Sequence, residues 1–431
     1  MPIILANSNN FRKFNEFIAN LSAKNINMIK RIKGFVQHYA WGGHHFLPSI
    51  LSIDNNERKP FAELWFGDHS GGTSLMIHNH QKEENLRQFI DLNPSTLLGE
   101  NTYIKDGGRL PFLLKILDVH KMLSIQAHPS KEAAVKGFND ENSRQIPLNA
   151  PNRVFKDQNP KPEMMVALSP FWLLHGFLPA EKAAEQLDIV PSLKEFSSIF
   201  KTEGIKNGYQ KWMELPQNDI DKILAPLRKS LLDKPDASLH KTSPDFWAKK
   251  AFHDFSREDG HLDRGVFSIY VMNIVHLQPG EAIFQDSGLL HAYLEGSNIE
   301  LMVNSDNVFR GGLTDKYMDI QLLLDHLDFH PTLPNILKPA VIDQNEKGFI
   351  IPSTDFELKE YELKKGDELI IAPSAGPSIL LCLHGSVCLK SEDTLPITSG
   401  EAFFIAHNTK IHLEQKGEES AVLFKAGIPQ S

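Results

Sequence analysis

The sequence contains little cysteine. Its 431 residues include only two, Cys382 and Cys388, and both lie late in the chain. So few thiols exclude a disulfide framework and a cysteine-based zinc site, and they fit the reducing environment of the cytoplasm. Any bound metal ion must therefore be held by histidine, carboxylate or amide side chains.

Long apolar runs and net positive charge are also absent. No apolar stretch reaches the roughly 18 residues that a membrane span needs, and the N-terminus lacks the pattern of a secretion signal. The formal net charge is -9, which argues against a general nucleic-acid surface. We therefore expect a cytoplasmic protein that binds a small molecule, and neither nucleic acid nor a membrane. We also expect it to act as a monomer.

Turn signals divide the chain into regions of different character, and its length predicts two to three domains. From about residue 30 to 175, short apolar runs alternate with glycine and proline turns, which indicates β-structure with a few helical pieces such as 130–138. β-Character returns over 266–277. Between these regions, three segments have helical spacing: 180–187, 193–200 and 220–232. A helical block thus interrupts a β-domain.

Residues 1–27 differ in pattern from the rest of the chain. Apolar side chains at helical spacing predict a short amphipathic helix around 10–22. An assembly arm and a dispensable extension are both compatible with this pattern, and we interpret the segment as a dispensable extension.

A weak internal repeat links two distant segments. Gly280–Phe284 reads Gly-Glu-Ala-Ile-Phe and is followed by His291, and Gly400–Phe404 reads Gly-Glu-Ala-Phe-Phe and is followed by His412. Glycine at a turn that leads into an apolar strand is typical of a jelly roll. The repeat therefore predicts two cupin-like barrels.

The most informative stretch is a predicted strand over 122–128. Because side chains alternate across a strand, Ser124, Gln126 and His128 share one face, and the apolar residues between them share the other. On its own, such a strand is typical of a half-buried polar surface. Glu163 and His291 add a carboxylate and a second imidazole, and this ligand set suits a catalytic divalent ion such as zinc, with a position left for water or substrate.

A set of short motifs gives these residues a common context. The motifs stand in this order: Tyr39–Gly43, Ala62–Gly67, Leu110–Leu113, Ser124–Lys131, Lys161–Glu163, Pro279–Phe284, His291–Gly296 and Asn304–Thr314. Together they resemble the type I phosphomannose isomerases, over roughly 28–330 and onward as that family's second barrel. One departure is Pro160, where the family often has a histidine before Lys-Pro-Glu.

The resemblance implies one zinc ion per chain and a set of residues around a sugar phosphate. The implied metal ligands are Gln126, His128, Glu163 and His291. The implied catalytic residues are Arg310, Lys161, Glu300, Asp306 and Tyr293. The implied substrate-binding residues are Ser124, Lys115 and Lys316. The pair His78 and His80 is expected to be polar surface, and His44, His45 and His120 are expected to be structural.

The resemblance also implies a fold that is mainly β with a helical insertion: two cupin-like jelly-roll barrels plus an α-helical domain. The expected domains are an N-terminal extension (1–27), a catalytic cupin in two parts (28–178 and 262–333), a helical domain (179–261) and a C-terminal cupin without metal (334–431).

The implied reaction interconverts mannose 6-phosphate and fructose 6-phosphate through a cis-enediol that zinc stabilises. Zinc and Arg310 would stabilise the developing oxyanion, and Glu300 or Lys161 would carry the proton between carbons. The alternatives are a non-catalytic sugar-phosphate-binding cupin and another cupin metalloenzyme. In the second barrel, Gly385 predicts a hairpin that brings Cys382 near Cys388, where both are expected to be small core residues.

Overall fold

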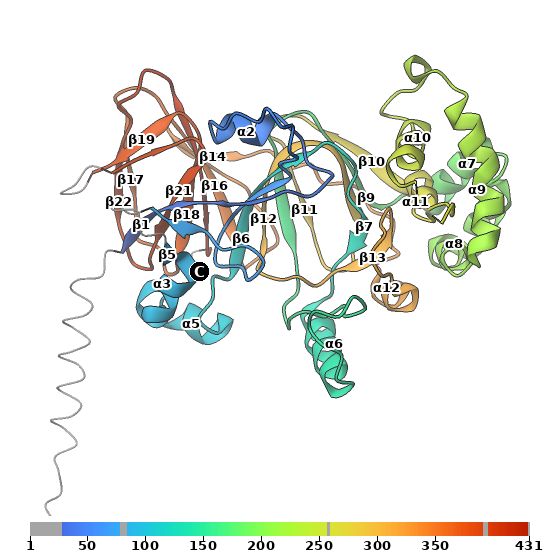
Figure 1. Ribbon diagram of the computed structural model, residues 1–431, viewed down its shortest axis with the longest axis horizontal. Helices are drawn as coiled ribbons and strands as arrows, with labels where there is room; N and C mark the ends of the chain where they lie inside the picture. The colour runs from blue at the N-terminus through green and yellow to red at the C-terminus, as the bar shows by residue number, and fades with distance from the viewer. Residues whose placement is uncertain (1–27, 78–83, 257–258, 391–394, 430–431) are drawn as a thin grey trace, which may run out of the picture.

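The computed structural model describes residues 28–77, 84–256, 259–390 and 395–429, so the helix expected over 10–22 and the pair His78 and His80 lie outside it. Figure 1 shows three regions along the long axis: C-terminal sheets at one end, central sheets, and a group of helices at the other end. No described helix combines the length and the apolar character needed to cross a bilayer.

The central region is a ten-stranded sheet built around β12 (His291–Val303). This strand pairs antiparallel with four others: β6 (Phe112–Val119), β7 (Ile125–Ala127), β8 (Glu163–Ala167) and β9 (Phe171–Phe177). The sheet is completed by β2 (Phe35–Gln37), β3 (Glu63–Phe66), β10 (Met272–Leu277), β11 (Ala282–Gln285) and β13 (Phe309–Gly312). Three of the segments expected to carry the site therefore meet on one strand.

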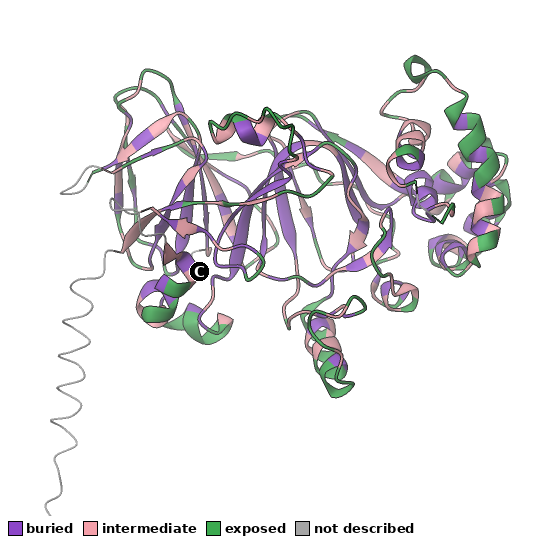
Figure 2. Ribbon diagram, in the orientation of Figure 1, coloured by how far each residue is buried: buried purple, intermediate pink, exposed green. Residues whose placement is uncertain are grey.

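Side chains alternate between the two faces of β12, and the two faces have different character. Ile299 and Leu301 are fully buried in an apolar cluster, while Glu300 between them points to the opposite face. Both faces of the strand are covered, as the buried central strands in Figure 2 show. The face that carries Glu300 is the one that holds the polar residues of the site.

The C-terminal region contains two more sheets. A nine-stranded sheet runs in the order β14 (Ala340–Asp343), β15 (Glu346–Gly348), β16 (Glu357–Leu363), β23 (Ala421–Gly427), β18 (Ser378–His384), β21 (Glu401–Ile405), β1 (Ile29–Lys33), β4 (Leu75–Met76) and β5 (Glu84–Asn85). A four-stranded sheet runs in the order β17 (Glu368–Ile371), β22 (Ile411–Glu414), β19 (Ser386–Leu389) and β20 (Leu395–Thr398). One apolar cluster contains residues from both sheets, among them Leu380 and Leu413.

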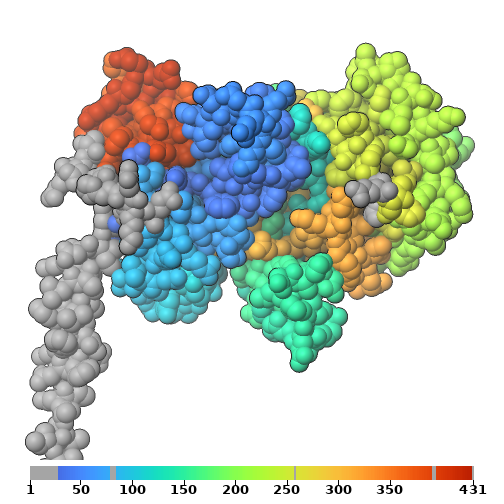
Figure 3. Space-filling view, viewed as in Figure 1, coloured from blue at the N-terminus to red at the C-terminus, as the bar shows by residue number. Residues whose placement is uncertain are grey.

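The two ends of the described chain are joined in the nine-stranded sheet. β1 pairs antiparallel with β21, and Arg31 forms an ion pair of 2.6 Å with Glu401, 370 positions further along the chain. A second apolar cluster combines early residues such as Phe66 and Phe112 with late ones such as Phe404. Figure 3 shows the early segments in contact with the C-terminal region on one face of the molecule.

The helical block is confirmed. Its helices are α7 (Ala180–Ile189), α8 (Lys194–Met213), α9 (Gln217–Leu232) and α10 (Pro244–Asp254), with a short 3-10 turn η1 (Asp236–Ser238). α8 is longer than the pattern over 193–200 predicted. Its inner face packs through Trp212, whose ring stacks on Phe267 at 4.4 Å between centroids. The helices therefore share one core with the neighbouring β-strands.

The strand expected over 266–277 is wrong in its first half. Val266–Val271 form helix α11, and only Met272–Leu277 form strand β10. Every residue of α11 is buried, so its apolar run lacks the polar face that would mark a helix. β-Branched and aromatic residues then favour a strand by propensity, but packing against the other helices overrides this preference.

The first half of the chain is more helical than its turn signals predicted. α6 (Lys131–Ser143) lies close to the expected position and begins after Ser130, whose side chain accepts a hydrogen bond from the amide of Ala133. Short helices also occur outside the expected positions: α2 (Phe46–Ile50), α3 (Leu86–Leu92), α4 (Pro94–Leu98) and α5 (Glu100–Asp106). α12 (Ile320–His326) comes after β13.

The hairpin expected around Gly385 is wrong. β18 and β19 belong to different sheets, where Cys382 lies opposite Leu423 and Cys388 lies opposite Pro396. Gly385 has a φ of 76° and turns the chain from one sheet into the other. Both thiols are free, and only Cys382 is fully buried.

Candidate active site

The inner face of the central sheet opens into a pocket of about 570 Å³. Most of the residues singled out in the sequence line it: Lys115, Ser124, Gln126, Lys161, Glu163, Tyr293, Glu300, Asp306, Arg310 and Lys316. They come from β6, β7, β8, β12, β13 and the loops beside these strands. Residues spread over some 200 positions of sequence therefore converge on one cavity.

Three ligand-type side chains meet at the pocket wall. Ligand atoms of His128, Glu163 and His291 all lie within 4.8 Å of one another, and all three residues are buried. Each imidazole Nε2 atom is 3.4 Å from a different oxygen of Glu163. Gln126 lies opposite His291 in the pairing of β7 with β12, and its side chain lines the same pocket. The four ligands expected from the sequence are thus neighbours.

The hydrogen bonds of the two histidines prepare them for a metal ion. The Nδ1 atom of His128 bonds to the carbonyl of Asn307 at 2.8 Å, and that of His291 bonds to the carbonyl of Leu289 at 2.9 Å. Because a carbonyl only accepts, Nδ1 carries the hydrogen and Nε2 keeps its lone pair. Both Nε2 atoms are buried without a hydrogen-bond partner. Two such lone pairs beside a carboxylate fit a zinc ion.

Burial supports the neutral form of the His128 ring. Desolvation, together with the charge of Lys161, lowers the pKa of His128 to about 4. A neutral imidazole is the form that binds metal. The Lys161 ammonium itself lies 2.6 Å from Glu163, so Lys161 belongs to the site and not to the surface.

A buried row of charges forms the next part of the pocket. The ammonium of Lys115 donates to Glu300 at 2.8 Å and lies 3.5 Å from Glu63. Burial alone would lower the pKa of Lys115, but the charges of nearby carboxylates, Glu300 first and then Glu63, help to outweigh burial and raise it. Burial raises the pKa of Glu300, against the opposing charge of Lys115.

Glu63 was missed in the sequence as a site residue. It accepts a hydrogen bond of 2.5 Å from the indole of Trp65, and the Lys115 ammonium lies 5.2 Å from the centre of that ring. Two features of the sequence could have identified Glu63. It lies two positions from Trp65, so the two side chains share one face of β3, and both residues belong to one of the family motifs.

Arg310 and Lys316 supply unpaired positive charge. Over the ranges that the structure describes, neither side chain forms an ion pair or a hydrogen bond to another side chain. Burial lowers the pKa of Lys316, and the nearby charge of Arg310 lowers it further. Two cations that face one cavity without a carboxylate partner are suited to bind an anion.

Asp306 lies on a loop that a half-buried carboxylate, Asp157, holds in place. Asp157 accepts hydrogen bonds from the hydroxyl of Ser305 and from the backbone amide of Asp306, both at 2.9 Å. The side chain of Asp306 is 3.3 Å from His69. Although burial opposes ionisation, the hydrogen bond and charge of His69 hold the pKa of Asp306 below its usual value. Asp157 and His69 had no signal in the sequence, because their partners are distant in the chain.

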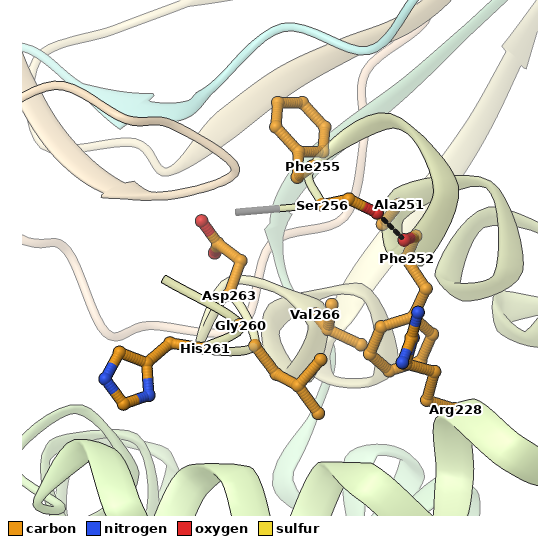
Figure 4. A pocket seen from close by; sticks show the side chains of 10 residues that line it. Arg228, Ala251, Phe252, Phe255, Ser256, Gly260, His261, Asp263 and Val266 are labelled. Carbon is orange, nitrogen blue, oxygen red and sulfur yellow. Dashed lines mark hydrogen bonds between the residues drawn. The ribbon is translucent and has the colours of Figure 1, made fainter. Parts of the chain in front are cut away.

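A smaller cavity of about 100 Å³ lies between the helices and the loop that precedes α11. Figure 4 shows its lining, which includes Arg228, His261 and Asp263. Phe255 lines both this cavity and the large pocket. The helical block therefore reaches the rim of the candidate active site.

Known proteins resemble this chain in sequence and in fold. Residues 29–180 match the phosphomannose isomerase type I catalytic domain. The chain is 35% identical to mannose-6-phosphate isomerase of Escherichia coli over 386 residues, which covers 88% of this chain and 95% of that protein. It is 30% identical to the rat enzyme of the same name, over 91% of this chain and 96% of that protein.

A solved structure gives the same match in three dimensions. Mannose 6-phosphate isomerase from Salmonella typhimurium, crystallised with fructose 6-phosphate and zinc, superposes with a TM-score of 0.81 at 31% sequence identity. The alignment covers 94% of this chain and all of that one.

Proposed function

This chain belongs to the type I phosphomannose isomerases, the zinc-dependent enzymes that interconvert mannose 6-phosphate and fructose 6-phosphate, and from that premise we propose which residues carry the reaction. One zinc ion is held by His128, Glu163 and His291, with Gln126 as the fourth ligand. The observation that carries this assignment is the pair of buried Nε2 lone pairs that flank Glu163. When bound, zinc supplies a Lewis acid that stabilises negative charge on a substrate oxygen.

The substrate lies along the pocket with its phosphate at Lys316, one of the two unpaired cations. Lys316 and the hydroxyl of Ser124 bind the phosphate, because no carboxylate of the described chain forms an ion pair with Lys316. Arg310 lies in β13 directly opposite Gln126, so its guanidinium stands beside the metal ligands. There it stabilises the oxyanion that develops when the proton leaves C2.

Glu300 is the group that carries the proton between C1 and C2. It lies on β12, 2.8 Å from Lys115, and it is a buried carboxylate of the pocket with a raised pKa. Lys115 holds its orientation, and Tyr293 lies buried on the same strand. Asp306 binds a sugar hydroxyl at the pocket rim, and Lys161 orients Glu163. Pro160 removes a histidine from this neighbourhood, which leaves the proton transfer to these groups.

The Glu300 assignment is tested with Glu300→Gln, which keeps the shape of the side chain and removes its basicity. We expect kcat to fall by about a hundredfold or more while zinc content stays at one per chain. In deuterated water, exchange at C2 of the substrate should fall together with isomerisation. Loss of zinc together with activity would instead show that Glu300 supports the metal ligands.

The metal assignment is tested by elemental analysis of the purified protein and of Glu163→Ala. We expect zinc and isomerase activity on mannose 6-phosphate in the first, and neither in the second. Full zinc content in Glu163→Ala would contradict the ligand set.

We also propose the finer architecture. The Gly280 and Gly400 turns both have φ near 80° and both lead directly into a strand, which supports two related jelly-roll barrels of the cupin type. The proposed domains are a catalytic cupin (28–178 and 262–333), a helical domain (179–261) and a C-terminal cupin without metal (334–431), after an extension at 1–27. The protein is proposed to act as a cytoplasmic monomer without nucleic-acid or membrane partners, and gel filtration of the purified chain tests the monomer.

A further inference from the structure

Asp263, in the segment between α10 and α11, is a buried carboxylate that binds the backbone just after strand β13. Asp263 is only 6% exposed. Its Oδ1 atom accepts hydrogen bonds from the backbone amides of Gly265 at 2.7 Å and Leu313 at 2.8 Å, and its Oδ2 atom accepts one from Thr314 at 3.2 Å. Figure 4 shows this carboxylate turned away from Arg228 and Val266, the residues on the helical side of the small cavity.

The backbone that Asp263 holds is in an unusual conformation. Leu313 has a φ of 53°, a region that side-chain-bearing residues rarely adopt. Such a conformation persists only where surrounding contacts impose it. Gly312 before it has a φ of 137°, and a Cβ atom there would lie 2.3 Å from the Cα of Gly265. Two glycine backbones are thus pressed together at the point where the carboxylate binds.

The segment that carries Asp263 is itself fixed to the helices. The backbone carbonyl of Arg264 accepts a hydrogen bond of 2.9 Å from the indole of Trp212, and the Arg264 guanidinium donates to the carbonyl of Met213. Both partners lie at the end of α8. The position of the Leu313–Thr314 turn is therefore set by the helical block.

This turn leads directly to the proposed phosphate-binding lysine. The hydroxyl of Thr314 accepts a hydrogen bond of 3.1 Å from the backbone amide of Lys316, and Leu313, Thr314 and Lys316 all line the large pocket. Asp263 itself does not line that pocket. Its influence on the substrate must therefore pass through the turn.

We propose that Asp263 is a positioning residue for phosphate binding: it fixes the Leu313–Thr314 turn and thereby places Lys316 over the pocket. This inference rests on the proposed role of Lys316. It gives the helical block a function in the reaction, because the end of α8 anchors the segment whose carboxylate holds this turn.

The first test is Asp263→Asn. The amide keeps the size of the side chain, but its NH2 group faces the amide of Thr314, so the hydrogen bond from that amide is lost. We expect KM for mannose 6-phosphate to rise about tenfold, and the inhibition constant of inorganic phosphate to rise equally. kcat should change less than about twofold and zinc content should not change, because the metal ligands lie elsewhere. A fall in kcat with an unchanged KM would overturn the proposal.

Asp221→Asn is the matched control. Asp221 accepts a hydrogen bond of 2.8 Å from the amide of Leu262, in the same segment, and contacts His261, but it makes no hydrogen bond to the turn. We expect a similar loss of thermal stability and an unchanged KM. Equal KM changes in the two variants would mean that only the general stability of the segment matters, which would also overturn the proposal.

A double-variant measurement separates this inference from the assignment on which it rests. If Asp263 acts through Lys316, the Asp263→Asn change should raise KM much less in a Lys316→Ala background than in the original chain. Additive effects would overturn the Asp263 proposal alone. An unchanged KM in Lys316→Ala by itself would instead contradict the phosphate role of Lys316.

Thr314→Val provides a second route if Asp263→Asn does not fold. It keeps the shape of the side chain and removes the hydroxyl that accepts the Lys316 amide. We expect KM and the phosphate inhibition constant to rise in the same direction by about threefold. No change in either would overturn the path from Asp263 to Lys316.

Discussion

The central and C-terminal regions both enclose the inner faces of antiparallel strands, and they fill that space with opposite kinds of side chain. Around β12 the enclosed side chains include Lys115, Glu163, Glu300 and two histidines, all buried. Between the two C-terminal sheets the buried cluster consists of residues such as Leu380, Leu413 and Leu423. One interior holds a pocket and the other holds a core.

The two Gly-Glu-Ala segments show that a small local change in sequence separates the polar interior from the apolar one. After Gly280, His291 opens β12 and points into the site with 1% of its surface exposed. After Gly400, His412 lies in β22 between buried Ile411 and Leu413, so its ring faces outward, where it contacts Glu368 at 2.8 Å. Which face of the strand a histidine occupies decides whether it is available to bind metal.

The largest expected effect comes from removing the inward histidines. His128→Ala and His291→Ala should each reduce isomerase activity to background and release zinc, because the three protein ligands that remain hold a divalent ion far less well than four. His412→Ala, the outward counterpart, should keep both zinc and activity. Elemental analysis and a coupled isomerase assay on the three variants check this. Full zinc content in His291→Ala would contradict the assignment of His291 as a metal ligand.

The next effect concerns charge inside the pocket. Arg310→Ala should lower kcat by about a hundredfold or more and change KM little, because the charge is needed most when the oxyanion forms. Arg310→Lys should restore only part of the rate, since an ammonium lacks the two parallel donors. Steady-state kinetics on both variants measure kcat and KM separately and so test this role. A change confined to KM would make Arg310 a phosphate-binding residue.

A third variant examines the apolar interior. Leu380→Ala should lower the free energy of unfolding by about 2–5 kcal/mol, because it leaves a cavity in the C-terminal cluster. Zinc content and kcat of the folded protein should be unchanged. Ile370→Ala, at an exposed position of β17, is the control and should change stability by less than about 0.5 kcal/mol. Denaturant titration gives both values, and similar values for the two would argue against a packed core.

The smallest effect is expected from the thiols. Burial raises the pKa of Cys382 to about 12, so this thiol is neutral and behaves as a small apolar group. The Cys382→Ala/Cys388→Ala double variant should keep zinc and activity and lose about 1 kcal/mol of stability. Thermal melts and elemental analysis measure this. Loss of zinc would place the metal in the C-terminal region.

Much of the site was predictable because its signals are local. The alternation of Ser124, Gln126 and His128 results from strand geometry alone, and the ordered motifs connected it to Glu163 and His291. The helices over 180–232 had clear apolar faces, and the structure confirms them.

The parts that could not be predicted depend on contacts between distant segments. The apolar run of α11 is compatible with a strand until the helices around it are in place. The prediction of a hairpin after Cys382 is wrong because a turn glycine does not reveal whether the next strand joins the same sheet or the facing one. Asp263 lies 50 positions before the amide that it binds, and no periodicity connects the two.

The pairing of β1 with β21 has a consequence for the order in which the molecule is assembled. Arg31 emerges from the ribosome 370 residues before Glu401, its partner, so β1 has no neighbour on that side until β21 has been synthesised. Contacts of such long sequence separation form slowly, because the entropy of the intervening chain must be lost first. The nine-stranded sheet therefore closes late, and a chain that stops before β21 leaves β1 with an open edge of the kind that pairs with other molecules.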